Sequence, residues 1–197
     1  MPQLEQALDL AWQQIDERLA LIQRRHHDRG DIPLYEAQAG PPATDADIEL
    51  LSRCLAMPVP LELEHALRKW NGRWIVHDHM ISLMAVWEHE QVARASQWSH
   101  EHSDVRFESV IGPINPVLES RRRICIGGHE GSGKFLFLDF EDPPAGGHLG
   151  QVIRMGEEPT AEFVAPSFLE FLRMVSRAPA YDDDPEFDPL KFDPGKP

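Results

Sequence analysis

The sequence predicts an α+β domain in which a mostly antiparallel sheet is flanked by helices, with an additional amphipathic helix at the amino terminus. Two observations support this fold class. Apolar residues follow helical spacing through most of the first half of the chain, whereas the second half contains four short strand-like runs separated by turn residues. A last amphipathic helix follows the strands. Helices before and after a meander of strands are typical of α+β proteins.

The first predicted helix is amphipathic and ends near Gly30. Apolar residues recur every three or four positions over residues 4–22, which is the spacing of a helix with one buried face. The sequence RRHH at residues 24–27 suits the carboxyl end of a helix, where positive charge is favourable. Residues 31–42 are rich in proline and glycine and predict a linker. Residues 1–43 are therefore interpreted as a helix and linker that pack on the following domain.

Residues 44–177 are predicted to form the α+β domain, and capping residues mark its first two helices. Thr44 with Asp47 forms a capping arrangement in front of an apolar stripe. Two prolines then stop this helix and start the next. The second helix is predicted to end at the Asn-Gly pair at residues 71–72, because both residue types tolerate the left-handed conformation of a carboxyl-terminal cap.

The remaining elements of the domain are mostly short strands. Residues 73–76 (RWIV) predict a strand, and a polar helix is predicted over about residues 86–102. The runs RRRICIG (residues 121–127) and KFLFLDF (residues 134–140) flank a glycine-rich connection, which predicts a hairpin. Two further strands are predicted in the sequences GQVIRM and TAEFVA.

The chain is predicted to end in a helix and an acidic tail. Ser167 and Glu170 form a capping box before an apolar face, which predicts the start of the last helix. Residues 178–197 contain six acids, two lysines and repeated Asp-Pro. This composition predicts a disordered tail.

The charge of the chain restricts its partners. Its 33 acidic and 19 basic residues give a formal net charge of −14, of which the tail supplies −4 and the other 177 residues −10. So acidic a surface repels nucleic-acid phosphate and anionic lipid, which argues against direct nucleic-acid and membrane binding. Basic proteins, cations or simple solubility explain the charge better, and a basic protein is the predicted partner. Two cysteines, no signal-peptide pattern and no long apolar run predict a cytoplasmic protein.

One motif resembles a phosphate-binding loop, but its context favours another interpretation. Gly128, Gly133 and Lys134 have the spacing G-x-x-x-x-G-K, whereas Phe135 replaces the Ser or Thr that would hold magnesium. A phosphate-binding loop opens a helix, and here a strand-like run follows. The glycines are therefore attributed to the hairpin, and no nucleotide cofactor is predicted.

Metal and nucleophile chemistry have little support. The histidine-rich segment 77–102 contains His77 and His79, which would share one face of a strand and could chelate a metal, but no third ligand is indicated. Scattered surface histidines are the favoured interpretation. Cys54 and Cys125 lie in apolar patterns typical of buried thiols. No metal, cofactor or catalytic residue is predicted, and the protein is not predicted to be an enzyme.

Two segments resemble the SUKH superfamily, which includes fungal cell-wall-assembly regulators of the Smi/Knr type and many bacterial immunity proteins. The sequence LAMPVPLELEHALRKWNG (residues 55–72) is similar to the family's helix signature, and residues 121–172 are similar to its run of strands and closing helix. The resemblance covers about residues 44–176. The matching positions of the second segment are Ile124, Ile126, Gly133, Leu136, Leu138, Asp139, Pro143, Gly150, Gln151, Val152, Ile153, Val164, Ala165, Ser167, Phe168, Phe171 and Leu172.

The resemblance implies a non-catalytic protein-binding module with an α+β fold. An immunity protein that neutralises a bacterial toxin domain, such as a nuclease, is the leading hypothesis, and a regulatory or scaffold protein of the cell-wall-assembly regulator type is the alternative. A metal- or nucleotide-dependent enzyme is a third hypothesis, which requires a ligand to co-purify. Acids and one large aromatic residue are the predicted partner-binding residues: Trp74, Asp78, Asp139, Glu141, Asp142, Glu157 and Glu158. For Asp139, at the end of a predicted strand, the alternative is a role in the turn through backbone hydrogen bonds.

Overall fold

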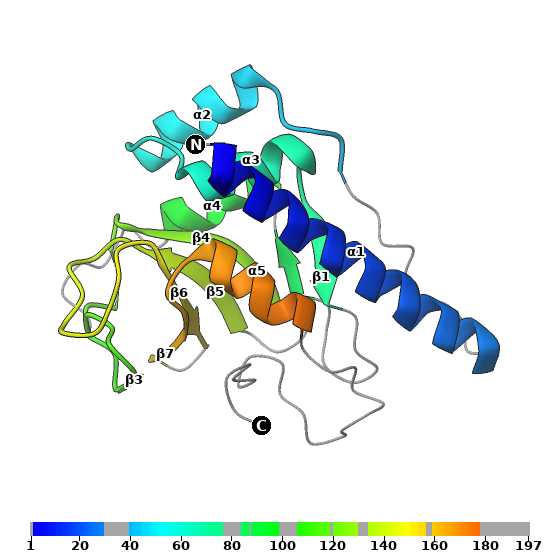
Figure 1. The fold of residues 1–197 in the computed structure, drawn as a ribbon. Coiled ribbons are helices and arrows are strands. Elements are labelled where there is room, and N and C mark those ends of the chain that lie inside the picture. Colours follow the sequence, from blue (N-terminus) through cyan, green and yellow to red (C-terminus); the bar gives the residue numbers. More distant parts are fainter. Residues whose placement is uncertain are drawn as a thin grey trace.

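The structure is a computed structural model that describes residues 2–29, 40–76, 84–86, 88–98, 106–118, 120–129, 134–156 and 159–177. Over these residues the chain forms five helices and one seven-stranded sheet (Figure 1). The helices are α1 (Pro2–Arg29), α2 (Asp45–Leu55), α3 (Leu61–Lys69), α4 (His89–Trp98) and α5 (Phe168–Arg177). The strands are β1 (Arg73–Val76), β2 (Met84–Val86), β3 (Ser109–Ile111), β4 (Arg123–His129), β5 (Lys134–Asp139), β6 (Gln151–Met155) and β7 (Thr160–Ala165).

The sheet has the strand order β1-β2-β4-β5-β6-β7-β3. Neighbouring strands are antiparallel except for β3, which pairs with β7 in the parallel sense. The predicted α+β fold with a mostly antiparallel sheet and an amino-terminal helix is therefore confirmed. The predicted tail (residues 178–197) and most of the predicted linker (residues 31–42) lie outside the described residues.

The two faces of the sheet have different coverings. On one face the side chains of β4 and β5 that point to the main core, such as Ile126 and Leu136, pack with those of α1, α2, α3 and α5. The alternate side chains, such as Cys125 and Phe137, point to the opposite face and form a smaller apolar cluster with Phe107. This division follows from the period of two along a strand, which sends neighbouring side chains to opposite faces.

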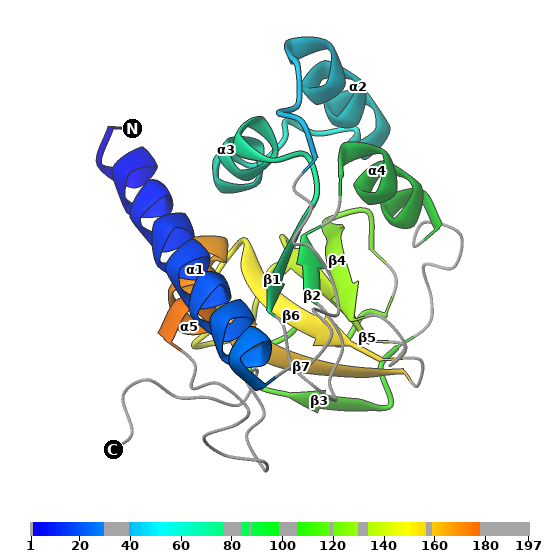
Figure 2. The ribbon, with the colours of Figure 1, turned by 90° about the vertical axis from the view of Figure 1, so that its right-hand side faces the viewer.

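Helix α1 shares the main core. It lies beside α5 along one side of the molecule (Figure 2), and its buried residues are Leu8, Ala11, Trp12, Ile15 and Leu19. The Trp12 ring meets that of Trp70 edge-on, with centroids 5.0 Å apart. The Arg18 guanidinium donates to the Val175 carbonyl at 2.7 Å, which supplies a partner at the carboxyl end of α5. Among the described residues, no helix has both the length and the apolar composition that a membrane span needs.

The amino terminus of α5 is capped from two elements. The Glu170 N–H donates to Ser167 Oγ at 3.2 Å, which is the N-cap half of the predicted capping box, while the Glu170 carboxylate accepts from Arg173. The Leu169 N–H donates to the Glu62 carboxylate of α3 at 3.1 Å. The closing helix is therefore fixed to α3 as well as to the sheet.

Replacing Glu62 by glutamine is expected to stabilise the protein at neutral pH. Burial raises the pKa of the Glu62 carboxyl above its ordinary value, and the backbone N–H donors offset this only in part. Because the folded-state pKa is above the unfolded one, the charged carboxylate opposes folding, and stability falls as pH rises through the folded-state pKa. Glutamine keeps an acceptor oxygen for the Leu169 N–H but carries no charge.

The measurement is the thermal unfolding midpoint of both proteins between pH 4 and pH 8. The midpoint of Glu62→Gln should exceed that of the parent at pH 7, and the difference should shrink towards pH 4. Glu49→Gln, at an exposed position of α2, is the control and should show no such trend. A Glu62→Gln protein that is less stable than the parent at pH 7 would contradict the expectation.

Candidate functional site

The topology of the sheet brings three connections to one end of it. The β1–β2, β4–β5 and β6–β7 connections each join antiparallel neighbours, and β2 is also antiparallel to β4, as β5 is to β6. All three connections therefore leave and re-enter the sheet at the same end, here called the hairpin end. Residues 112–122, which join β3 to β4, and residues 140–150, which join β5 to β6, meet at the opposite end, here called the loop end.

The predicted partner-binding residues divide between these two ends. Asp78 belongs to the β1–β2 connection and the pair Glu157 and Glu158 to the β6–β7 connection, so these acids belong to the hairpin end. All three lie outside the described residues, as does the side chain of Trp74. Asp139, Glu141 and Asp142 are at the loop end. β5 and β6 contain five to six residues, so roughly 17–20 Å of sheet separates its two ends.

Asp139 is fully buried, which corrects the prediction that it contacts a partner. As the last residue of β5 it points to the same face as Phe137, because the two are separated by the strand period of two. Its Oδ1 accepts from the Arg123 guanidinium at 3.0 Å and from the Glu141 N–H at 3.1 Å. The Gln151 amide approaches Oδ2 at 3.4 Å. The buried Asp139 carboxylate therefore holds together β4, the start of the β5–β6 connection and the start of β6 at the loop end.

Arg123, Asp139 and Gln151 form a buried polar core that sequence reasoning did not identify. The Arg123 guanidinium donates to the carbonyls of Val117, Leu118 and Asn115, and it lies 5.1 Å from the centroid of the Phe107 ring. The Gln151 amide donates to the Pro113 carbonyl at 3.0 Å, and its oxygen accepts from the His148 N–H at 3.1 Å. Residues 113–118 and the β5–β6 connection are thereby fixed by the same three side chains.

Glu141 and Asp142 lie at the edge of the loop end. The half-buried Glu141 carboxylate accepts from the Ser120 hydroxyl. Asp142 is exposed, and its carboxylate is 3.2 Å from the Arg122 guanidinium. Ion pairs this exposed contribute little to stability, so Asp142 is free to exchange Arg122 for another cation. Of the predicted acids that the structure describes, Asp142 is the one that a partner can reach most easily.

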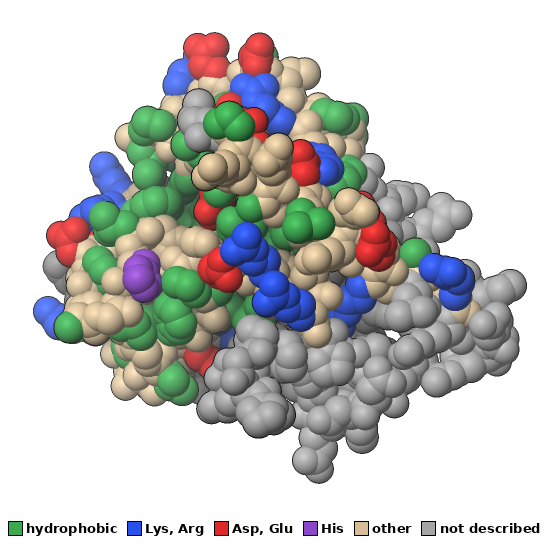
Figure 3. Space-filling model, viewed as in Figure 1, with side chains coloured by type: hydrophobic (Ala, Val, Ile, Leu, Met, Phe, Trp, Pro, Cys, Tyr) green, Lys and Arg blue, Asp and Glu red, His purple; other side chains and the backbone are tan. Residues whose placement is uncertain are grey.

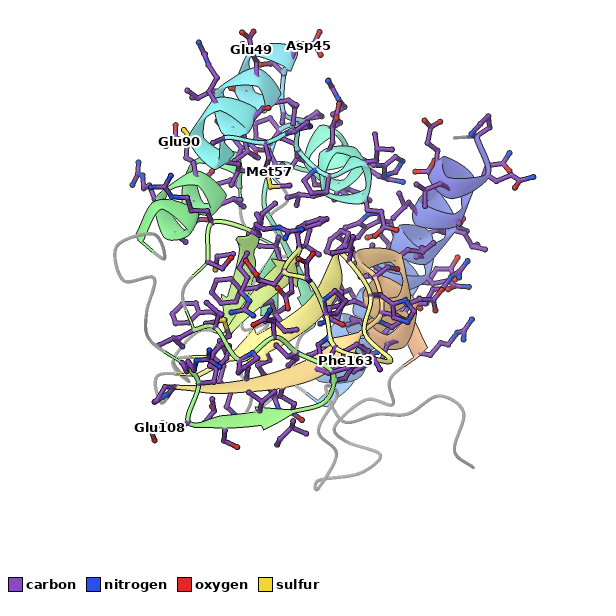
Figure 4. The ribbon with its side chains drawn as sticks, turned by 90° about the vertical axis from the view of Figure 1, so that its left-hand side faces the viewer. Asp45, Glu49, Met57, Glu90, Glu108 and Phe163 are labelled. Atoms are coloured by element: carbon purple, nitrogen blue, oxygen red, sulfur yellow. The ribbon has the colours of Figure 1, made fainter. Side chains whose placement is uncertain are left out.

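The other exposed acids of the described residues are spread over several elements. Asp45 and Glu49 project from α2, Glu90 from α4 and Glu108 from the segment before β3 (Figure 4). Glu5, Asp9 and Glu17 of α1 and Glu88 before α4 are exposed as well. Asp45 is paired with Arg68, and Glu90 with Arg94. The framework of helices and strands therefore has no single acidic face.

The histidine that the structure describes within the predicted histidine-rich segment has a structural role. The His89 N–H donates to the Asn71 side-chain oxygen at 2.8 Å, and the His89 ring lies 3.5 Å from the Asp47 carboxylate. These contacts join α2, the end of α3 and α4. Within the described residues, no three His, Cys, Asp or Glu side chains are grouped so as to hold a metal ion, and His77, His79, His100 and His102 lie outside them.

Cys125 and the strands on either side of the glycine-rich sequence also have structural roles. Burial raises the pKa of the Cys125 thiol to about 12, so this buried cysteine is not a thiolate at neutral pH. β4 and β5 pair in the antiparallel sense with Gly128 opposite Phe135, which confirms the predicted hairpin. A strand, and not a helix, therefore follows the glycine-rich sequence, as the hairpin interpretation requires.

Comparison with protein families gives one match. The model of the SMI1 / KNR4 family (SUKH-1) matches residues 42–174, which include α2 to α4, all seven strands and most of α5. Helix α1 lies before the matched residues although it shares their core. A search of curated proteins found no match to the chain. Because the family model covers well over half of the sequence, this chain belongs to the SMI1 / KNR4 family (SUKH-1).

Proposed function

We propose that this protein is a non-catalytic immunity protein that binds and neutralises a basic toxin domain, such as a nuclease, in the cytoplasm. Membership of the SMI1 / KNR4 family is consistent with an immunity or a regulatory role. The distribution of charge favours the first of these. The partner is recognised by acidic connections at the hairpin end, and no cofactor takes part.

The observation that carries the proposal is that the acidity belongs to the connections and the tail. The described residues hold 18 of the 33 acids and 17 of the 19 basic residues, so their charges nearly balance. The other residues hold 15 acids and two lysines. Of these 15 acids, four belong to the three connections of the hairpin end, which contain no lysine or arginine: Asp78, Glu130, Glu157 and Glu158.

This distribution suits a partner that binds nucleic acid. A nuclease must present positive charge to phosphate, and an acidic surface of an inhibitor is attracted to the same positive surface. Opposite charges raise the rate of encounter and orient the two proteins before they touch. An acidic hairpin end on a nearly neutral framework would direct this attraction to one end of the sheet.

Neutralising the acids of the hairpin end is expected to slow binding of the toxin domain encoded beside this protein by about tenfold or more. The variant replaces the four acids by their amides: Asp78→Asn, Glu130→Gln, Glu157→Gln and Glu158→Gln. A control with the same change of net charge replaces four exposed acids of the helices and their flanking residues: Glu5→Gln, Glu17→Gln, Glu49→Gln and Glu88→Gln. Association rates are measured at low and high salt, together with rescue of growth on co-expression.

The parent complex should weaken with salt, and the hairpin-end variant should lose both association rate and growth rescue. The control should retain growth rescue. Equal losses in both variants would show that net charge, and not this end of the sheet, governs binding. Failure of the parent to bind the neighbouring toxin would reject the immunity function.

A regulatory or scaffold role is the second candidate, and α1 is the feature that favours it. This helix lies before the residues matched by the family model, and it adds an outer surface that includes the exposed Leu10. A regulator would capture several endogenous proteins from the native cell, and its deletion would give a phenotype in the absence of any toxin.

A further inference from the structure

A surface without formal charge extends from the edge strand β3 to the loop end. Residues 109–118 (SVIGPINPVL) and residues 143–150 (PPAGGHLG) contain no Asp, Glu, Lys or Arg, although 26% of the whole chain is charged. These two segments are called the neutral patch below. Both are described by the structure throughout, and much of each is exposed. Long uncharged stretches on the surface of so acidic a protein need a physical explanation.

The two segments pack against each other and form one surface. The Asn115 side-chain amide donates to the Asp142 carbonyl at 3.3 Å, directly before the second segment. A Cβ atom added to Gly147 would lie 2.7 Å from the Pro113 carbonyl oxygen and 2.5 Å from Pro143 Cβ, so the backbones are in close contact there. Glycine at 147 permits this approach.

Large apolar side chains are exposed on this surface. Ile111 is 62% exposed and Leu149 is 60% exposed, and these are the two most exposed large apolar residues among those described. Pro116 and Pro144 are also exposed. Figure 3 shows mainly hydrophobic and uncharged atoms around one histidine on this side of the molecule, with charged side chains towards its edge. An apolar centre inside a charged rim is the composition of a protein–protein interface.

The polar core holds the neutral patch in a fixed shape. Arg123 and Gln151 bind main-chain carbonyls of the first segment, and Gln151 also binds the His148 N–H of the second. Two prolines in each segment restrict the backbone further. A surface fixed in this way loses little conformational entropy when it is covered.

We propose that a second copy of this chain covers the neutral patch in a two-fold symmetric dimer. Two molecules that each carry a net charge of −14 repel each other, and the neutral patch is a surface where they meet without opposing acids. An apolar surface is complementary to itself, which is what a two-fold interface requires. Because these segments contain no acid, they offer no ion pair to a basic toxin. We therefore do not assign the toxin to the neutral patch.

The proposed dimer leaves two of the three connections free at the hairpin end of each molecule. The first segment begins beside the β6–β7 connection, since Ser109 pairs with Thr160. The β1–β2 and β4–β5 connections belong to strands further across the sheet, so covering the patch leaves them accessible. The dimer therefore does not depend on the proposed immunity function. The two proposals can be tested and can fail separately.

The test is the mass of the full chain in sedimentation velocity, over a wide range of protein concentrations and at low and high NaCl. The expected result is a monomer–dimer equilibrium that shifts to dimer as salt is raised, because salt screens the repulsion between the acidic molecules. A charge-steered toxin complex responds to salt in the opposite sense. A monomer at every concentration and salt level would overturn the proposal.

Variants locate the interface. Leu149→Asp and Ile111→Asp should each raise the dimer dissociation constant at least about tenfold, because a two-fold dimer would bury two unpaired carboxylates. Leu10→Asp and Leu61→Asp are matched controls, since these leucines are 55% and 57% exposed on α1 and α3. Circular dichroism checks the fold of each variant, and either patch variant suffices if the other is unfolded. A dimer that both patch variants leave unchanged, or that the controls weaken equally, would reject this interface.

Discussion

Replacing Arg123 by alanine is expected to destabilise the protein by about 3–5 kcal/mol. The Arg123 side chain is only 1% exposed, and its guanidinium binds the fully buried Asp139 carboxylate and three main-chain carbonyls. Removing the guanidinium leaves the buried Asp139 carboxylate without its cation and the three carbonyls without their donor. Removing one partner of a buried ion pair destabilises a protein strongly, because the other charge stays buried and unpaired. Urea unfolding measured by fluorescence or circular dichroism gives the change in the free energy of unfolding.

Arg122 provides the matched control for this prediction. It is the neighbouring residue, but its ion pair with Asp142 is exposed, so Arg122→Ala should cost less than about 1 kcal/mol. A double variant, Arg123→Met with Asp139→Leu, removes both charges and should recover part of the loss. If Arg123→Ala costs no more than Arg122→Ala, the polar core does not hold the loop end as described.

Replacing Trp12 by alanine is expected to cost about 3–5 kcal/mol, as truncation of a large buried aromatic residue does. Trp12 is 1% exposed in the main core, and it packs edge-on against Trp70 although it precedes the residues matched by the family model. The expectation is therefore that α1 unfolds together with the rest of the domain. Thermal or urea unfolding followed by circular dichroism should show one transition, shifted strongly in the variant.

The exposed face of α1 supplies the control. Leu10→Ala changes an apolar residue on the same helix that is 55% exposed, and its effect should stay within about 0.5 kcal/mol. A separate early transition for α1, or similar costs for Trp12→Ala and Leu10→Ala, would mean that the helix is not an integral part of the core.

Sequence patterns predicted the elements that carry a clear capping, apolar-spacing or turn pattern of their own. The capping box at Ser167 and the apolar face after it predicted α5, and the runs on either side of the glycine-rich sequence predicted the β4–β5 hairpin. The strands β2 and β3 were missed because three residues are too few to show an alternating pattern. Their place in the sheet depends on pairing with distant residues.

Asp139 shows where the reasoning about the site was incomplete. Its position in the strand, two residues after Phe137, places both side chains on the same face, and the same relation holds for Arg123 and Cys125. Applying strand alternation to these charged residues would have predicted a buried pair. Which connections share an end of the sheet could not be found in this way, because that follows from the strand order and not from any local sequence.

The gathering of three connections at one end of the sheet bears on where this chain can accept insertions. Lengthening a surface connection costs little, about 0.6 kcal/mol for each doubling of its length. The contacts of Arg123, Asp139 and Gln151 are all made at the opposite end. Connections at the hairpin end can therefore be exchanged or extended without disturbing that network. Insertions should therefore be tolerated better at this end of the sheet than at the loop end.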